Sequence, residues 1–258
     1  AGEVVRVNPQ YRGVRDRHLN FLFDGQSGDL QAVIAGGELN VWRTAAPAGL
    51  ACRYLAQPGT KTIALLGSSR QARGQIVSIS RTVSSLEKVR VFSPNEEHRK
   101  SFATKMSVWL GIEVQAVDSA RAAIDGAGII SLATNSRTPV LQHEWIVPGA
   151  LIISITSGQL SADLVARSRV IATWKGELLE GVPPREPYTA MMAAGTWSEE
   201  KLAAEFAEVI LGQKPARNNP TEIIVFESLG MPAFDATAAA WAYRWALGHK
   251  IGKEFTLF

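Results

Sequence analysis

A glycine turn within residues 64–75, ALLGSSRQARGQ, carries the clearest chemical pattern in the chain. An apolar strand stops at Gly67 and a helix follows, the arrangement whose backbone amides hold a pyrophosphate. Ser69 stands where the usual second glycine would let the phosphate approach. A serine adds only a small side chain, and its hydroxyl can donate to a phosphate oxygen. The turn is therefore compatible with a dinucleotide site and also with an ordinary strand–helix connection.

The end of the next strand bears on the choice of dinucleotide. The strand VRVF ends at Ser93, where an acidic side chain would bind the ribose 2′-hydroxyl of NAD and repel a 2′-phosphate. Ser93 does neither, and Arg70, His98 and Arg99 are cations that could meet a phosphate. We therefore expect NADP(H) rather than NAD(H). The alternative interpretation is that His98 and Arg99 belong only to a solvated helix face.

Composition argues against several classes of function. The 258 residues are 46% hydrophobic, and 27 basic against 24 acidic residues give a net charge of only +3, so no overall field recruits nucleic acid. The single cysteine, Cys52, excludes an intramolecular disulfide, and we find no metal-ligand spacing. No apolar run approaches the roughly 20 residues of a membrane span, and the N-terminus lacks the order of a signal peptide. We expect a soluble cytoplasmic protein.

The elements that would position the turn follow a regular order. Residues 19–41 read as a β-hairpin, and a helix begins at Thr44 with Pro47 in its first turn. Strands then alternate with helices over about residues 60–175, which predicts an α/β fold with a doubly wound parallel sheet. Beyond it we expect an amphipathic helix at SEEKLAAEFAEVILG, a strand at TEIIVFES and a helix at DATAAAWAYRWALG.

The final helix places two tryptophans four residues apart, Trp241 and Trp245, with small alanines beside them. This spacing puts both indoles on one helix face. Such a face suits a dimer or interdomain contact, and it also suits ordinary core packing, which we favour.

Five segments together carry a resemblance to a known family. They are LFDGQSGDLQAVIAGGELNVWRTAA (22–46), LLGSSRQARGQ (65–75), AGIISLATNSRTPVL (127–141), PGALIISITS (148–157) and EIIVFESLGMPAFDATAAA (222–240). The Arg-Thr-Ala-Ala tetrad, the Gly-x-x-x-Gln-Ala turn and the Phe-x-Ser-x-Gly…Asp tail, in this order, resemble the ornithine cyclodeaminase/mu-crystallin family. That family also includes alanine dehydrogenases and ketimine or iminosuccinate reductases.

The resemblance implies a two-domain organisation. A Rossmann-type NAD(P) domain, expected at residues 59–218, is inserted in a smaller α+β domain made of residues 1–58 and 219–258. The smaller domain is expected to bind substrate and to form a homodimer.

The resemblance also implies roles for individual residues. The tetrad arginine is Arg43, a catalytic and substrate-binding residue whose planar fork suits a carboxylate. Asp235 is a further candidate for substrate binding, although capping of the following helix is the favoured structural alternative. The implied cofactor-binding residues are Gly67, Ser68, Ser69, Arg70, Gln71 and Ala72 in the turn, Ser93, Thr134, Asn135, Ser136, Thr156, Ser157, Ser228 and Gly230.

One departure from the family concerns a lysine that lies near the reacting carbon. No lysine precedes Lys61 here, and Arg6 is the best occupant of that place, as a catalytic and substrate-binding residue. An arginine holds a carboxylate well but does not readily lend a proton. The sequence leaves open whether N-terminal residues that carry the family lysine are absent or lie outside this numbering.

A second departure narrows the activity. Cyclodeaminases place an aspartate in the loop after IISIT, whereas this chain reads Ser157-Gly158-Gln159 and has no carboxylate there before Asp163. A cyclodeaminase is therefore disfavoured. We expect an NAD(P)H-dependent reductase of a small imino acid, or equivalently an amino-acid dehydrogenase, that moves hydride between nicotinamide C4 and a C=N carbon. The alternative is a non-catalytic, NADP(H)-dependent small-ligand-binding protein of mu-crystallin type.

Overall fold

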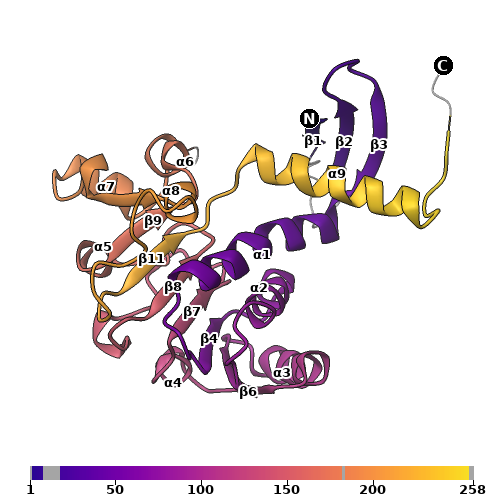
Figure 1. Cartoon of the computed structure of the whole chain (residues 1–258). Helices are drawn as coiled ribbons and strands as arrows, with labels where there is room; N and C mark the ends of the chain where they lie inside the picture. The colour runs from indigo at the N-terminus through magenta and orange to yellow at the C-terminus, as the bar shows by residue number, and fades with distance from the viewer. Residues whose placement is uncertain (1, 8–17, 182–183, 256–258) are drawn as a thin grey trace. The chain divides into compact units, whose positions relative to one another are not determined.

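The computed structural model describes residues 2–7, 18–181 and 184–255 (Figure 1). The chain divides into two compact units, one made of Ala1–Arg43 with Met231–Phe258 and the other of Thr44–Gly230. The domain boundaries predicted at 58/59 and 218/219 both fall inside the second unit. A helix at residues 36–55 continues across the boundary between the units at residues 43 and 44. The last strand of the chain, at residues 224–227, belongs to the sheet of the second unit. The assignment of substrate and cofactor to the two domains stays a prediction.

The smaller unit is built on an antiparallel sheet. Its strands, in spatial order, are β1 (Gly2–Val7), β2 (Leu19–Asp24) and β3 (Leu30–Ala35). The β2–β3 pairing confirms the predicted hairpin. The Asp24 carboxylate accepts two turn amides at 2.8 and 3.0 Å, and Gly28 takes the left-handed φ of +77° that the turn requires. Helix α9 (Pro232–Gly248) packs against β1 and β2.

Helix α1 (Gly36–Leu55) begins earlier than the sequence indicated. The predicted start at Thr44 was wrong, and Pro47 lies in the helix interior rather than in the first turn. A proline there removes one helical hydrogen bond. The helix persists because its apolar stripe is buried in the core of the larger unit, and tertiary packing outweighs a local penalty of this kind. The stripe comprises Ala48, Ala51, Cys52 and Leu55.

The larger unit contains an eight-stranded sheet in which every neighbouring pair is parallel. The strands, in spatial order, are β10 (Leu202–Glu205), β9 (Arg169–Ala172), β11 (Ile224–Glu227), β8 (Leu151–Ser154), β7 (Ile129–Leu132), β4 (Thr62–Leu66), β5 (Lys88–Phe92) and β6 (Glu113–Ala116). The chain runs from β4 outward to β6 and then returns to β7 on the other side of β4. That reversal is a topological switch point, and ligands of such sheets bind beyond the carboxyl ends of the strands there.

Helices cover both faces of this sheet. They are α2 (Arg70–Ser80), α3 (Glu96–Leu110), α4 (Ala120–Ile124), α5 (Ala162–Ala166), α6 (Lys175–Glu180), α7 (Tyr188–Ala193) and α8 (Phe206–Ile210), with 3-10 turns η1 (His143–Trp145) and η2 (Glu199–Lys201). Along β4, Ile63 and Leu65 join the core shared with α1, α2 and α3, whereas Ala64 and Leu66 join the core shared with α4, α5 and α7. This alternation confirms the predicted doubly wound α/β fold.

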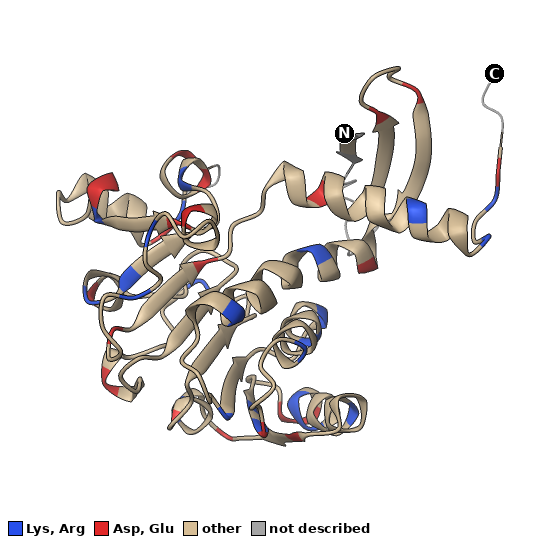
Figure 2. Ribbon diagram, viewed as in Figure 1, with Lys and Arg blue, Asp and Glu red and all other residues tan. Residues whose placement is uncertain are grey.

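Two expectations outside the alternating block were wrong. The segment SEEKLAAEFAEVILG is not one helix, because Leu202–Glu205 forms the edge strand β10 before α8. Trp241 and Trp245 are not core residues of this chain, since they are 62% and 45% exposed and stack on each other with ring centroids 6.5 Å apart. No helix in the described ranges is long and apolar enough to cross a membrane. Basic and acidic residues are interspersed along both units (Figure 2).

Candidate active site

The glycine turn after β4 has a shape that only glycine allows. Gly67 takes a φ of +124°, and a Cβ on it would lie 2.2 Å from the carbonyl oxygen of Ala133, which follows β7. The loops after β4 and β7 therefore meet at the switch point with no room for a side chain. Gly67 N donates to the Phe92 carbonyl at 2.8 Å, which ties the end of β5 to the same place.

The start of α2 fits a diphosphate. Ser69 is the N-cap residue, with extended φ and ψ of −88° and −178°, and its hydroxyl accepts from Ala72 N at a long 3.5 Å. The first turn contains no acidic side chain and begins with Arg70. The amides and partial positive charge of the helix start are thus not offset by a carboxylate. Gln71 Oε1 is buried with no hydrogen-bond partner among the described residues, but as an acceptor it is not part of the donor set. The donor set and the glycine turn fit a dinucleotide.

The residues near Ser93 form an internal network. Ser93 is 8% exposed, and its hydroxyl lies 2.9 Å from the hydroxyl of Ser68, which links the end of β5 to the turn. Arg99 is only 6% exposed and donates to the Ser93 carbonyl at 3.3 Å and to Asp118 at 2.6 Å. The solvated-face interpretation of Arg99 was therefore wrong, and its guanidinium is already held by protein oxygens. His98 is exposed, and its backbone amide donates to the Asn95 cap at 2.8 Å.

The remaining predicted cofactor residues lie on three loops at the carboxyl edge of the sheet. In the loop after β7, Thr134 Oγ1 accepts from Ser136 N at 3.1 Å, and Asn135 is exposed. Thr156, in the loop after β8, donates to the Thr134 carbonyl at 3.3 Å. Gln159 donates to both Thr134 and Thr156. These hydroxyls brace the loops against each other.

The loop after β11 is braced in the same way. Ser228, which is 5% exposed, donates its backbone amide to the Ser154 carbonyl at 2.8 Å. Leu229 N donates to Thr173 Oγ1 at 2.9 Å, and Gly230 is exposed. The hydroxyl of Thr156 and the backbone of Ser228 thus tie the loops to neighbouring strand ends, while Asn135 is exposed at the carboxyl edge.

In the smaller unit, the two predicted substrate residues form an ion pair. Arg43 Nε lies 3.2 Å from Asp235 Oδ1, and Arg43 also donates to Asn40 Oδ1 at 2.8 Å. Asp235 lies in the first turn of α9, whose N-cap is Met231, so the capping alternative was wrong. Arg6 is on β1 as the register partner of Asn20. The side chain of Arg6 lies outside the described part of the structure.

One charged pair at the carboxyl edge was not predicted from the sequence. Arg185 and Glu227 form an ion pair whose side chains are 11% and 1% exposed. Glu227 ends an otherwise apolar strand, and an acidic residue at the carboxyl end of a buried strand was the signal that could have identified it. Arg185 lies in the proline-rich segment before α7, where no pattern marked it.

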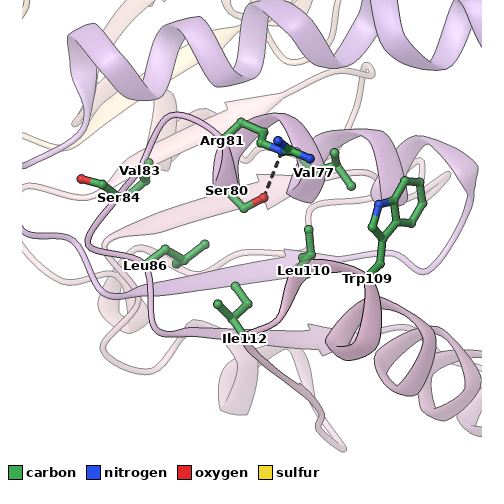
Figure 3. A pocket seen from close by; sticks show the side chains of 9 residues that line it. All are labelled: Val77, Ser80, Arg81, Val83, Ser84, Leu86, Trp109, Leu110 and Ile112. Atoms are coloured by element: carbon green, nitrogen blue, oxygen red, sulfur yellow. Dashed lines mark hydrogen bonds between the residues drawn. The ribbon is translucent and has the colours of Figure 1, made fainter.

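A pocket of about 250 Å³ lies apart from all these residues (Figure 3). It is formed by the C-terminal ends of α2 and α3 and by the segments that precede β5 and β6. Its lining residues are Val77, Ser80, Arg81, Val83, Ser84, Leu86, Trp109, Leu110 and Ile112. Since these segments meet at the amino edge of the sheet, none of the predicted site residues lines this pocket.

The parallel sheet covered on both faces, with a glycine turn and helix start at its switch point, defines a Rossmann-type dinucleotide-binding fold. The chain belongs to the ornithine cyclodeaminase/mu-crystallin family, whose sequence model matches residues 7–250.

Its relatives lie in the imine-reductase branch of that family. Delta(1)-pyrroline-2-carboxylate reductase of Bacillus cereus is 29% identical over an alignment 266 positions long that covers 98% of this chain and 79% of the relative. Ketimine reductase mu-crystallin of Mus musculus is 31% identical over 232 residues, covering 88% and 69%. Among solved structures, Thermococcus litoralis Delta(1)-pyrroline-2-carboxylate reductase in complex with NADH and L-proline is 32% identical with a TM-score of 0.87, covering 92% of this chain and 74% of that chain.

Proposed function

We propose that this protein is an NAD(P)H-dependent reductase of a small imino acid. The observation that carries the proposal is its similarity, at a TM-score of 0.87 and 32% identity, to a reductase solved with NADH and L-proline. The glycine turn of this chain independently fits the diphosphate of such a cofactor. When bound, the dihydronicotinamide would supply the hydride that reduces the imine carbon, and water or a protein acid would supply the proton for the nitrogen. The reverse reaction is that of an amino-acid dehydrogenase.

The residues of the chain would bind and orient the reactants. Gly67 and the first turn of α2 would hold the diphosphate through backbone amides. The braced loops that contain Thr134, Thr156 and Ser228 would contact the rest of the cofactor. Arg43 would bind the substrate carboxylate through its terminal nitrogens, which form two parallel hydrogen bonds to such a group. These roles account for binding and alignment, which a hydride transfer between two bound reactants needs most.

We infer NADP(H) over NAD(H) from the absence of a carboxylate at Ser93. Ser93 directly follows β5, and its hydroxyl lies within hydrogen-bond distance of the Ser68 hydroxyl. An uncharged serine at this position does not repel a 2′-phosphate. Arg99 is not expected to bind the phosphate, because its guanidinium already donates to Asp118. Arg70, at the first position of α2, is the cation that we expect to meet the phosphate.

We also infer a homodimer and a cytoplasmic location. The indoles of Trp241 and Trp245, 62% and 45% exposed and stacked on one face of α9, form an apolar surface of the kind that partner chains cover. Cell fractionation would test the location.

The test of function is an absorbance assay. The protein would be mixed with NADPH or NADH and with Delta(1)-pyrroline-2-carboxylate, or with pyruvate and methylamine as a precursor of a linear imine. Oxidation of the nicotinamide that depends on the imine supports the proposal. A protein that binds NADPH tightly but oxidises none of it would instead be the non-catalytic ligand-binding protein, an alternative motivated by the lack of a lysine within residues 1–60 and by Ser69 in the glycine turn. Ammonia release from ornithine without net cofactor consumption would indicate a cyclodeaminase.

A further inference from the structure

A buried charged pair joins two neighbouring strand ends at the carboxyl edge of the large sheet. Arg185 Nε donates to Glu227 Oε2 at 3.1 Å, and a terminal nitrogen of Arg185 donates to the same oxygen. That nitrogen also donates to Ser154 Oγ at 3.2 Å. Glu227 ends β11, Ser154 ends β8, and the two residues are register partners. One guanidinium therefore bridges the last residues of adjacent strands.

The neighbours of Arg185 hold the loop that follows β8. Glu186 N donates to Ser157 Oγ at 2.8 Å, and Gly158 N donates to the Glu186 carbonyl at 3.1 Å. On the opposite flank, Thr156 Oγ1 donates to the Thr134 carbonyl at 3.3 Å. The loop at residues 155–158 is therefore fixed from both sides, on one side by the segment that carries Arg185.

The burial of this ion pair means that removing only one of its two charges would destabilise the fold. Glu227 is 1% exposed, and a buried charge without its partner is strongly destabilising. Tyr188 is fully buried beside the pair, and burial first, then the charge of Glu227, raise the pKa of its phenol well above the ordinary range. The phenol thus stays neutral, and Arg185 supplies the positive charge that balances Glu227.

Stability alone does not account for a charged pair at this place. Replacing a buried ion pair by apolar residues of similar volume is often neutral or stabilising. Here the charges stand where two predicted cofactor-contacting loops begin, and a planar guanidinium can bind an acid and a hydroxyl in fixed directions. This geometry aligns the loops with each other.

We propose that Arg185 is a positioning residue of the reductase. By bridging Glu227 and Ser154 it holds the loops at residues 155–158 and 228–230 in the single arrangement that hydride transfer requires. This inference rests on the proposed function. Misplacement of bound reactants by about 1 Å can cost about 100-fold in rate.

The test separates charge balance from geometry. Arg185→Lys keeps the positive charge, but a lysine is a point charge that does not reproduce the planar bridge. Arg185→Met with Glu227→Gln removes both charges, and Arg185→Met alone leaves Glu227 unpaired. The matched control is Arg167→Met with Asp163→Asn, which removes an exposed arginine–aspartate pair 3.0 Å apart on α5 and its C-cap.

For each variant we would measure Tm, amide hydrogen exchange, NADH and NADPH affinity by fluorescence, and kcat and KM. Arg185→Met alone should lower Tm by about 6 °C or more, and adding Glu227→Gln should recover much of that loss. In Arg185→Lys and in the double variant, amides of residues 155–158 and 228–230 should exchange at least about 10-fold faster. Their kcat should fall about 10- to 100-fold, while KM for the imine changes less than about threefold. The control pair should leave all four readouts unchanged.

Two results would overturn the proposal. One is wild-type exchange and wild-type kcat in the double variant, which would make the pair a contribution to stability alone. The other is a lower Tm in Arg185→Lys with unchanged loop exchange. If the wild type binds a dinucleotide but reduces no imine, the proposed function fails, and exchange and affinity still decide the positioning role. Faster loop exchange with weaker nucleotide binding would then support it, and no change in either would reject it.

Discussion

Arg43 of α1 and Asp235 of α9 form an ion pair within the smaller unit, with Nε and Oδ1 3.2 Å apart and side chains 13% and 18% exposed. Asn40 holds the same guanidinium through a terminal nitrogen at 2.8 Å. Two acceptors thus orient the arginine before any substrate binds. A carboxylate ligand would meet a cation whose direction is already set and whose charge is shared with Asp235.

The first prediction concerns this pair. Arg43→Lys should lower kcat/KM for the imino acid about 10- to 100-fold, because a charge-assisted hydrogen bond contributes about 1.5–3 kcal/mol and lysine loses the two-pronged contact. Asp235→Asn should raise KM about three- to tenfold, since the guanidinium is less well oriented. Steady-state kinetics would check both. Asp29→Asn, on the exposed turn between β2 and β3, is the control, and an unchanged kcat/KM in Arg43→Lys would contradict the assigned role.

The second prediction concerns the glycine turn. Gly67→Ala should lose dinucleotide affinity and lower the free energy of unfolding by more than about 2 kcal/mol, because the added Cβ would lie 2.2 Å from the Ala133 carbonyl oxygen at a φ of +124°. Gly59→Ala is a matched control, since Gly59 has a φ of +76° but a Cβ added to it would meet nothing within 4 Å. It should cost only about 1 kcal/mol and leave affinity intact. Urea unfolding would measure the stability of both variants, and fluorescence titration would measure their dinucleotide affinity. Equal losses of affinity in the two variants would contradict the binding role of the Gly67 turn.

The third prediction concerns cofactor choice. Ser93→Asp should weaken NADPH binding at least about 10-fold while changing NADH binding less than about threefold, because an aspartate at the end of β5 repels a 2′-phosphate and can accept from a 2′-hydroxyl. Parallel titrations with the two nucleotides would give the ratio. Ser93→Ala controls for the lost bond to Ser68 at 2.9 Å. A wild type that already prefers NADH would refute the inferred preference.

The fourth prediction concerns Cys52 and alkaline pH. Burial raises the pKa of the Cys52 thiol far above its ordinary value. The unfolded chain releases the proton near pH 8.5 while the folded chain retains it, so the thiol stabilises the fold fully below that pH and progressively less above it. Above pH 8.5 the wild type should lose about 1.4 kcal/mol per pH unit more than Cys52→Ala. Urea unfolding between pH 7.5 and 10 would measure this difference. A thiol that reacts with a disulfide reagent in the folded state would contradict it.

The fifth prediction concerns the exposed indoles of α9. Trp241→Ala with Trp245→Ala should convert a dimer to a monomer, which light scattering after gel filtration would detect. The control is Trp174→Ala, which removes a tryptophan that is 42% exposed in the larger unit. A wild type that is monomeric at micromolar concentration would rule out the homodimer.

Much of the larger unit could be predicted from the sequence because its signals are local. Buried parallel strands such as β4 are continuous apolar runs, and Asn95 with Glu96 and Glu97 marked the start of α3, as the structure confirms. The strand β10 was missed because Leu202–Glu205 is short and lies directly before a helical turn. The early start of α1 was missed because Gly36 is a poor helix residue, and its place is set by contact with His18, which a Cβ would approach to 2.0 Å.

The candidate site also contains some residues that the sequence predicted and some residue pairs that it did not. Gly67 and Ser93 follow strands directly, so their place at the sheet edge could be read from the chain order. The bond between Arg99 and Asp118 and the bridge of Arg185 to Glu227 join residues far apart in sequence. Such pairings depend on tertiary packing, and periodicity and motif spacing hold no information about them.

The position of β11 between β8 and β9 constrains how the protein is made. Those two neighbours leave the ribosome well before Ile224–Glu227, which pairs with both of them. Until that segment emerges, β8 and β9 each lack a partner on the side that β11 will fill and expose unpaired backbone N–H and C=O groups there. Contacts over long sequence separation also form slowly. Truncated or stalled chains that end before β11 should therefore be substrates for chaperones and proteases, whereas completion of a single four-residue strand closes the sheet.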